Sequence, residues 1–193
     1  MAVTSWKAGQ ICSSDSSIGT LDWVSTEFFD PLDADEVQAS DAKYAGTPAG
    51  FGVSNSYYLK CEDFGFTSSD IPSGSTIDGI EVEVVRYRKP TIATVTNLIK
   101  LVKGGTISGS DFGNSTDWST STETVNFGSS SELGGLSFSQ SDVTASNFGV
   151  AIAFQSASYM GPTAGRQWYI DRVRIRVNYT LPTATRRRTG QIV

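Results

Sequence analysis

Hydrophobic and polar residues alternate along two well-separated stretches of the chain, IDGIEVEVV at residues 77–85 and DRVRIRVNY at residues 171–179. In the first stretch, isoleucine and valine alternate with glutamate. The second stretch has the same period, with arginine in place of glutamate. A period of two residues is typical of a β-strand that buries one face and exposes the other. Both stretches are therefore predicted to be strands of an antiparallel sheet with one solvated face.

The exposed faces of these two strands carry opposite charges. The outward positions are Glu81 and Glu83 on the first strand and Arg172, Arg174 and Arg176 on the second. Opposite charges on neighbouring strands contribute about 0.2–1 kcal/mol for each pair, and a slip of one residue would bury them. We therefore predict that the two strands are neighbours in one sheet, with the arginines beside the glutamates.

Shorter β patterns occupy much of the remaining chain, at residues 54–66, 95–102, 123–128 and 148–157. Turn residues separate them, as in DIPSGSTIDG and the pair Gly104–Gly105. No alternation of strands with helical patterns occurs, which argues against a parallel α/β sheet. The spacing predicts an all-β fold: an antiparallel, jelly-roll-like β-sandwich with an extended N-terminal arm and a short C-terminal tail.

These patterns divide the chain into three parts. Residues 1–50 are predicted to be an irregular N-terminal arm, residues 51–181 the β-sandwich domain, and residues 182–193 a basic tail. Candidate partner-binding residues in the arm are aromatic, because such side chains concentrate binding energy at interfaces: Trp6, Trp23 and Phe28. The alternative is that these aromatics pack against their own domain.

The tail contains three consecutive arginines on an otherwise acidic chain, Arg186, Arg187 and Arg188. They are candidates for docking to an acidic partner surface. A solvated tail with no partner is the alternative.

The charge balance and the residue types limit the function classes. The formal net charge is −5 and the chain contains no histidine. An acidic surface argues against binding to nucleic acid, and histidine is the commonest general base and metal ligand. We therefore expect no enzymatic activity, no cofactor and no metal, and we interpret the acidic run at residues 30–36 as a solvated turn rather than a calcium site.

We expect no secretion signal and no association with a membrane, because no long apolar run occurs.

Cys12 and Cys61 are the two cysteines of the chain. They could pair, but two cysteines do not make a disulfide framework. Two separate thiols in a reducing compartment are the favoured interpretation, with pairing left open.

Four segments carry a family resemblance: SYYLKCEDFGFTSSDIPSGSTIDGIEVEV, NLIKLVKGG, SNFGVAIAF and YIDRVRIRVNYT. Together they resemble a group of tailed-bacteriophage virion proteins that share a pattern of strands and turns. The motif residues are Phe64-Gly65-Phe66, Ile71-Pro72-Ser73-Gly74 and Ile80-Glu81-Val82. The resemblance covers residues 54–180, and the chain departs from the pattern at residues 159–165, YMGPTAG.

The resemblance implies a structural component of the virion, made in the cytoplasm of the bacterial host. Such a protein would be a capsid decoration (cement) protein, a minor head protein or a tail component. Its partners would be other virion proteins, major capsid or tail subunits, and a homo-oligomer such as a trimer would fit. The alternative is a carbohydrate-binding recognition module of a tail or fibre, for which surface aromatics are the candidates: Trp118, Tyr159 and Trp168.

Overall fold

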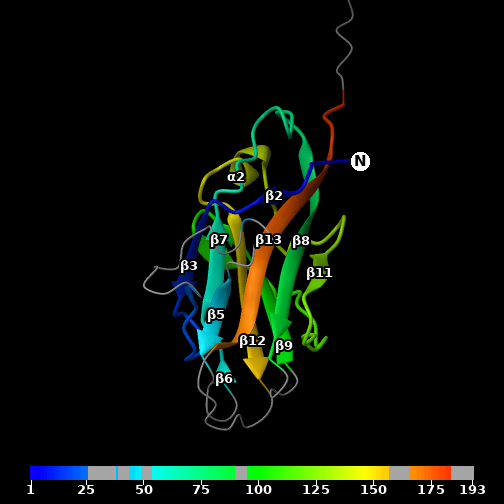
Figure 1. The fold of residues 1–193 in the computed structure, drawn as a ribbon. Helices are drawn as coiled ribbons and strands as arrows, with labels where there is room; N and C mark the ends of the chain where they lie inside the picture. The colour runs from blue at the N-terminus through cyan, green and yellow to red at the C-terminus, as the bar shows by residue number, and fades with distance from the viewer. Residues whose placement is uncertain (26–37, 39–43, 49–53, 90–94, 157–165, 184–193) are drawn as a thin grey trace, which may run out of the picture.

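The computed structural model describes residues 1–25, 38, 44–48, 54–89, 95–156 and 166–183 of the 193-residue chain. Two antiparallel sheets pack face to face as a β-sandwich (Figure 1). The seven-stranded sheet, called sheet A, has the order β11 (Glu123–Gly128), β8 (Thr76–Arg88), β13 (Arg166–Thr180), β5 (Ala45–Pro48) and β4 (Val24–Ser25), with β1 (Ala2–Val3) and β2 (Lys7–Ala8) also paired to β13. The predicted all-β sandwich is confirmed.

The six-stranded sheet, called sheet B, lies behind sheet A in Figure 1. Its order is β10 (Thr106–Ser108), β9 (Val95–Lys103), β12 (Gly149–Ser156), β7 (Tyr58–Glu62) and β3 (Ile11–Asp15), with β6 (Ser54–Asn55) paired to β12. The short helix α2 (Gln140–Val143) is capped by the Ser139 side chain, which accepts from the backbone N–H of Asp142. Within the described residues, no helix is long and apolar enough to cross a membrane.

The two strands of opposite charge are neighbours, as the sequence predicts. β8 pairs with β13 in antiparallel register, and this register places Glu83 opposite Arg174 and Glu81 opposite Arg176. The alternate positions of both strands, such as Val82 and Ile175, face the other sheet and are fully buried. The prediction that the two strands are neighbours, with arginines beside glutamates, is therefore confirmed.

Aromatic side chains fill one region of the space between the sheets. Phe154 of β12 lies against three tryptophans, with centroid distances of 5.9 Å to Trp23, 5.8 Å to Trp118 and 4.3 Å to Trp168. Trp23 is only 1% exposed, and its indole N–H donates to the carbonyl of Tyr57 at 2.8 Å. Trp23 is therefore a core residue and is not available as the partner-binding anchor that the sequence suggested.

The N-terminal region differs from the irregular arm expected for residues 1–50. β1, β2 and β5 lie in turn along the edge of β13 that β8 leaves open, while β3 joins sheet B. The reason is the length of β13, whose 15 residues present backbone groups that need partners on both sides. Strands of two to four residues satisfy them but are too short to show a hydrophobic period.

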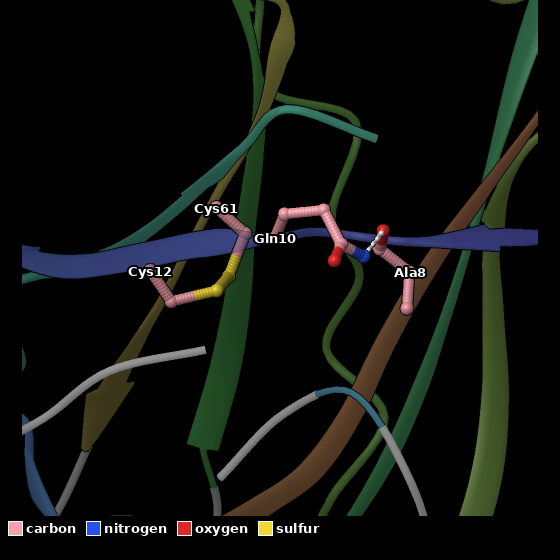
Figure 2. Close-up of a disulfide and its surroundings, with 4 residues drawn as sticks. All are labelled: Ala8, Gln10, Cys12 and Cys61. Atoms are coloured by element: carbon pink, nitrogen blue, oxygen red, sulfur yellow. Dashed lines mark hydrogen bonds between the residues drawn. A yellow bond between two sulfur atoms is a disulfide. The ribbon is translucent and has the colours of Figure 1, made fainter. Parts of the chain in front are cut away.

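Cys12 and Cys61 form a disulfide, whereas the sequence favoured separate thiols. They lie directly opposite each other on β3 and β7, with a Cα–Cα distance of 4.2 Å (Figure 2). Residues facing each other at the closely spaced positions of an antiparallel pair approach to about 4.5 Å, which allows the bond. Just before β3 the chain crosses from sheet A to sheet B at Gly9, where a Cβ would come within 3.2 Å of the Cys61 Cβ.

Candidate partner-binding face

The outer face of sheet A carries a lattice of ion pairs between β8 and β13. Glu83 Oε1 lies 3.1 Å from Arg172 Nη2 and 2.7 Å from Arg174 Nη2. Glu81 Oε2 lies 2.7 Å from Arg176 Nη2. Together with Trp6, described below, these five residues define a surface that we call the arginine face.

Strand periodicity and one irregularity place these side chains outward. The register of β13 against β8 shifts between Ile170 and Arg172, so Asp171 is an extra residue on β13, and it shifts again between Asn178 and Tyr179. From Arg172 to Val177, the outward residues of β13 are arginines, and the residues between them are the aliphatic core side chains Val173, Ile175 and Val177.

The guanidinium groups stand above the carboxylates. The side chains of Arg172, Arg174 and Arg176 are 23%, 30% and 35% exposed, whereas those of Glu83 and Glu81 are 11% and 17% exposed. A hydrogen bond from Arg176 holds the pKa of Glu81 below its usual value, so this carboxyl stays ionised. Solvent and any partner therefore meet mainly positive charge on this face.

Trp6 lies between β1 and β2 and packs on two of the arginines. The Arg176 Cζ is 4.7 Å from the centre of the Trp6 ring, and the Arg174 Cζ is 5.9 Å from it. Such cation–π contacts contribute about 0.5–1 kcal/mol at exposed sites. The candidate anchor Trp6 thus packs on Arg174 and Arg176, which the sequence predicted only to form ion pairs.

Three tyrosines gather at the other end of the same outer face. Tyr87 and Tyr169 are opposite each other on β8 and β13, and their rings stack at 4.5 Å with an interplanar angle of 5°. Tyr44 meets both rings edge-on, at 5.3 Å and 5.9 Å. Burial raises the pKa of Tyr87 to about 12, so its phenol stays neutral. Sequence reasoning missed this cluster, although Tyr87 continues the outward alternation of Glu81 and Glu83.

A cluster of buried polar side chains lies beside the tryptophans in the interior. Arg86 is 1% exposed; its Nε donates to Glu123 Oε1 at 3.0 Å, and its Nη1 donates to Asn97 Oδ1. The indole N–H of Trp118 donates to the same Asn97 oxygen at 2.6 Å, and the Arg86 Cζ lies 4.9 Å from the Trp118 ring centre. Trp118 and Trp168 are consequently core residues, not surface aromatics that could stack on a sugar.

The remaining candidates lie elsewhere. Phe28, Arg186, Arg187, Arg188 and Tyr159 fall outside the described residues, as does the acidic run at residues 30–36. Within the described part of the chain, no group of three or more potential metal ligands is found.

Comparison with known proteins gives little similarity. No family model and no curated protein matches the chain. Among solved structures, the CBM22-1 xylan-binding domain from Paenibacillus barcinonensis Xyn10C is similar with a TM-score of 0.41 and 6% identity, over 91% of this chain and 94% of that chain. The fold class rests on the strands and pairings described above.

Proposed function

We propose that the protein is a non-enzymatic structural component of a tailed-bacteriophage particle, most specifically a capsid decoration or minor head protein that binds neighbouring virion subunits. The observation that carries the proposal is the outer face of sheet A, where Trp6 and three arginines lie on the same surface as three tyrosines. Tryptophan, tyrosine and arginine are the residue types that dominate binding energy at protein interfaces.

The dimensions of this face suit such an interface. β8 has 13 residues and therefore extends over about 43 Å. Four neighbouring strands, at about 4.8 Å each, give a width of roughly 20 Å. The product, on the order of 800 Å², is an upper limit because β11, with six residues, runs along only part of β8. This limit is about the area that one partner buries in an interface of standard size.

The location in a virion is supported by the resemblance of the strand and turn pattern to tailed-phage virion proteins. The residues that carry this pattern have structural roles in the fold. Phe64 and Phe66 pack against Phe148 at 6.5 Å and 6.3 Å, and Ile71 and Ile80 are fully buried. A closed homo-oligomer, a trimer included, belongs to the same proposal.

Immunogold labelling of purified particles tests this function. An antibody raised against the protein should label intact particles at one defined location, and the purified protein should rebind to particles that lack it. Particles that carry no label and shells that take up no protein would refute the proposal.

The alternative function is carbohydrate recognition by a tail or fibre component. The observation in its favour is the tyrosine cluster on the outer face of sheet A, where Tyr44 and Tyr87 are partly exposed, because aromatic rings can stack on sugars. A glycan array probed with the wild-type protein and with Tyr87→Ala separates the two functions. Strong glycan binding that Tyr87→Ala abolishes would favour recognition, whereas an empty array would favour the structural role.

A further inference from the structure

We infer that the arginine face is the docking surface for a carboxylate-rich segment of a partner protein, which Arg174 and Arg176 hold while Trp6 supports their guanidinium groups from one side. This inference rests on the proposed function, because it names the chemistry of the partner at the proposed interface. It requires that the face offer positive charge and free donors, that the arginines be held in place, and that the partner be a short acidic segment.

The first requirement concerns charge. The face holds three arginines against two glutamates, a local charge of 3 − 2 = +1 on a chain whose net charge is −5. The two carboxylates are also the more covered groups, as described above. A negatively charged partner therefore meets attraction at this face and repulsion over the rest of the acidic chain.

Arg174 and Arg176 also have more N–H donors than their hydrogen bonds to Glu83 and Glu81 use. A guanidinium has five N–H donors. Arg176 uses one of these donors on a side chain, Glu81 Oε2, while Asn178 Nδ2 donates to Glu81 Oε1 at 2.9 Å. The Nε of Arg176 is buried, so the donors open to a partner are on its Nη atoms. Arg174 uses its Nε and one Nη on a single oxygen of Glu83. Donors on the exposed sides of Arg174 and Arg176 remain for a further carboxylate.

Trp6 keeps the guanidinium groups of Arg174 and Arg176 in position and leaves their N–H groups available as donors. A ring that stacks on a guanidinium covers its flat face and leaves the N–H groups at its edge open. The N–H groups of such an edge match the two oxygens of a carboxylate, which makes the contact bidentate and directional. The entropy lost when a partner binds is smaller because the arginines are already ordered by Trp6 and the glutamates.

The size of the charged area selects a short protein segment. A nucleic acid or another long polyanion needs a basic stripe that follows many charges. Here the basic area is confined to three neighbouring positions of β13, and β11 beside it offers small exposed residues, Thr124, Asn126 and Gly128. Two or three carboxylates of an acidic segment fit this area.

The test uses the full-length protein and a fluorescently labelled hexaglutamate peptide at low and at physiological salt. The wild-type protein should bind the peptide, and added salt should weaken binding. Arg174→Gln/Arg176→Gln should reduce the affinity about tenfold or more, since each charged hydrogen bond contributes about a factor of ten. Lys103→Gln is the matched control: this lysine has the same 35% side-chain exposure as Arg176 but lies on sheet B, and its loss should change the affinity less than twofold.

A second variant keeps the test valid if the double glutamine variant folds poorly. Arg174→Lys/Arg176→Lys keeps both positive charges beside the glutamates but loses the planar fork, so it should fold and still lose several-fold in affinity. Equal binding by this variant and the wild type would overturn the bidentate arginine contact.

Three further results would overturn the inference: no peptide binding by the wild-type protein at low salt, an equal loss in Lys103→Gln, or tighter arginine-dependent binding to polygalacturonate, which would make the ligand an acidic sugar. The outcome is separable from that of the proposed function. Particles that carry the protein while the peptide does not bind would refute only this inference, and peptide binding without any label on particles would refute only the virion assignment.

Discussion

Removal of the Cys12–Cys61 disulfide should destabilise the protein by several kcal/mol. The bond joins residues that are 49 apart in the sequence. The chain-entropy relation gives about 4 kcal/mol at 25 °C for a closed loop of that length. A domain of this size is stable by only about 5–15 kcal/mol, so the bond contributes a large part of the free energy of unfolding.

The same loss can be expressed as a melting temperature. The entropy of unfolding is about 2.1 cal/mol/K per residue, or about 0.4 kcal/mol/K for 193 residues. A loss of about 4 kcal/mol then lowers Tm by roughly 10 °C. The effect should be local as well: β3 is an edge strand of sheet B, and its backbone amides should exchange much faster once the bond is removed.

Thermal unfolding followed by circular dichroism measures this effect. Both sulfurs are buried, so the wild-type protein is reduced in denaturant and refolded with reductant before the scan. Cys12→Ala/Cys61→Ala is the control, because its Tm should be low and should not depend on reductant. Two free thiols titrated in the untreated protein, or a Tm that reduction changes by less than about 2 °C, would refute the reasoning.

Three further predictions concern the ion pairs and the buried polar cluster. Glu83→Ala leaves two guanidiniums without their shared acceptor and should lower the free energy of unfolding by about 1–3 kcal/mol in urea titrations; an unchanged midpoint would contradict the pairing. The pKa of Glu81 is lower in the folded than in the unfolded state, chiefly because of the hydrogen bond from Arg176. Its contribution to stability is therefore present above the ordinary glutamate pKa of 4.5 and lost as the pH falls through the folded value, and Glu81→Gln should flatten this part of the stability–pH curve. Trp118→Phe removes one of the two donors to the buried Asn97 oxygen, the other being Arg86, and should cost about 0.5–1.5 kcal/mol in the same titration, whereas a neutral effect would contradict the buried contact.

The long strands of the fold could be predicted from the sequence because they satisfy several constraints at once. β8 and β13 are long enough to show a clear period, and their opposite charges fix the register. The ion pairs of the arginine face follow directly from that register. The edge strands could not be found in this way, because they form only where β13 offers unpaired backbone groups, and those positions depend on the tertiary structure.

The different roles of Trp6 and Trp23 could not be predicted from the sequence either. Trp6 and Trp23 stand in similar polar surroundings along the chain. Their environments diverge because Trp23 enters the aromatic core around Phe154, whereas Trp6 packs on the outer arginines. The disulfide was missed for a related reason: Cys12 lies on an edge strand that the hydrophobic pattern does not reveal.

The most direct test of the account is cryo-electron microscopy of intact tailed-phage particles that contain the protein. We expect a β-sandwich attached to a neighbouring virion subunit through the outer face of sheet A, with Arg174 and Arg176 against carboxylates of that subunit. A sandwich bound through another surface, with the arginine face open to solvent, would contradict this expectation.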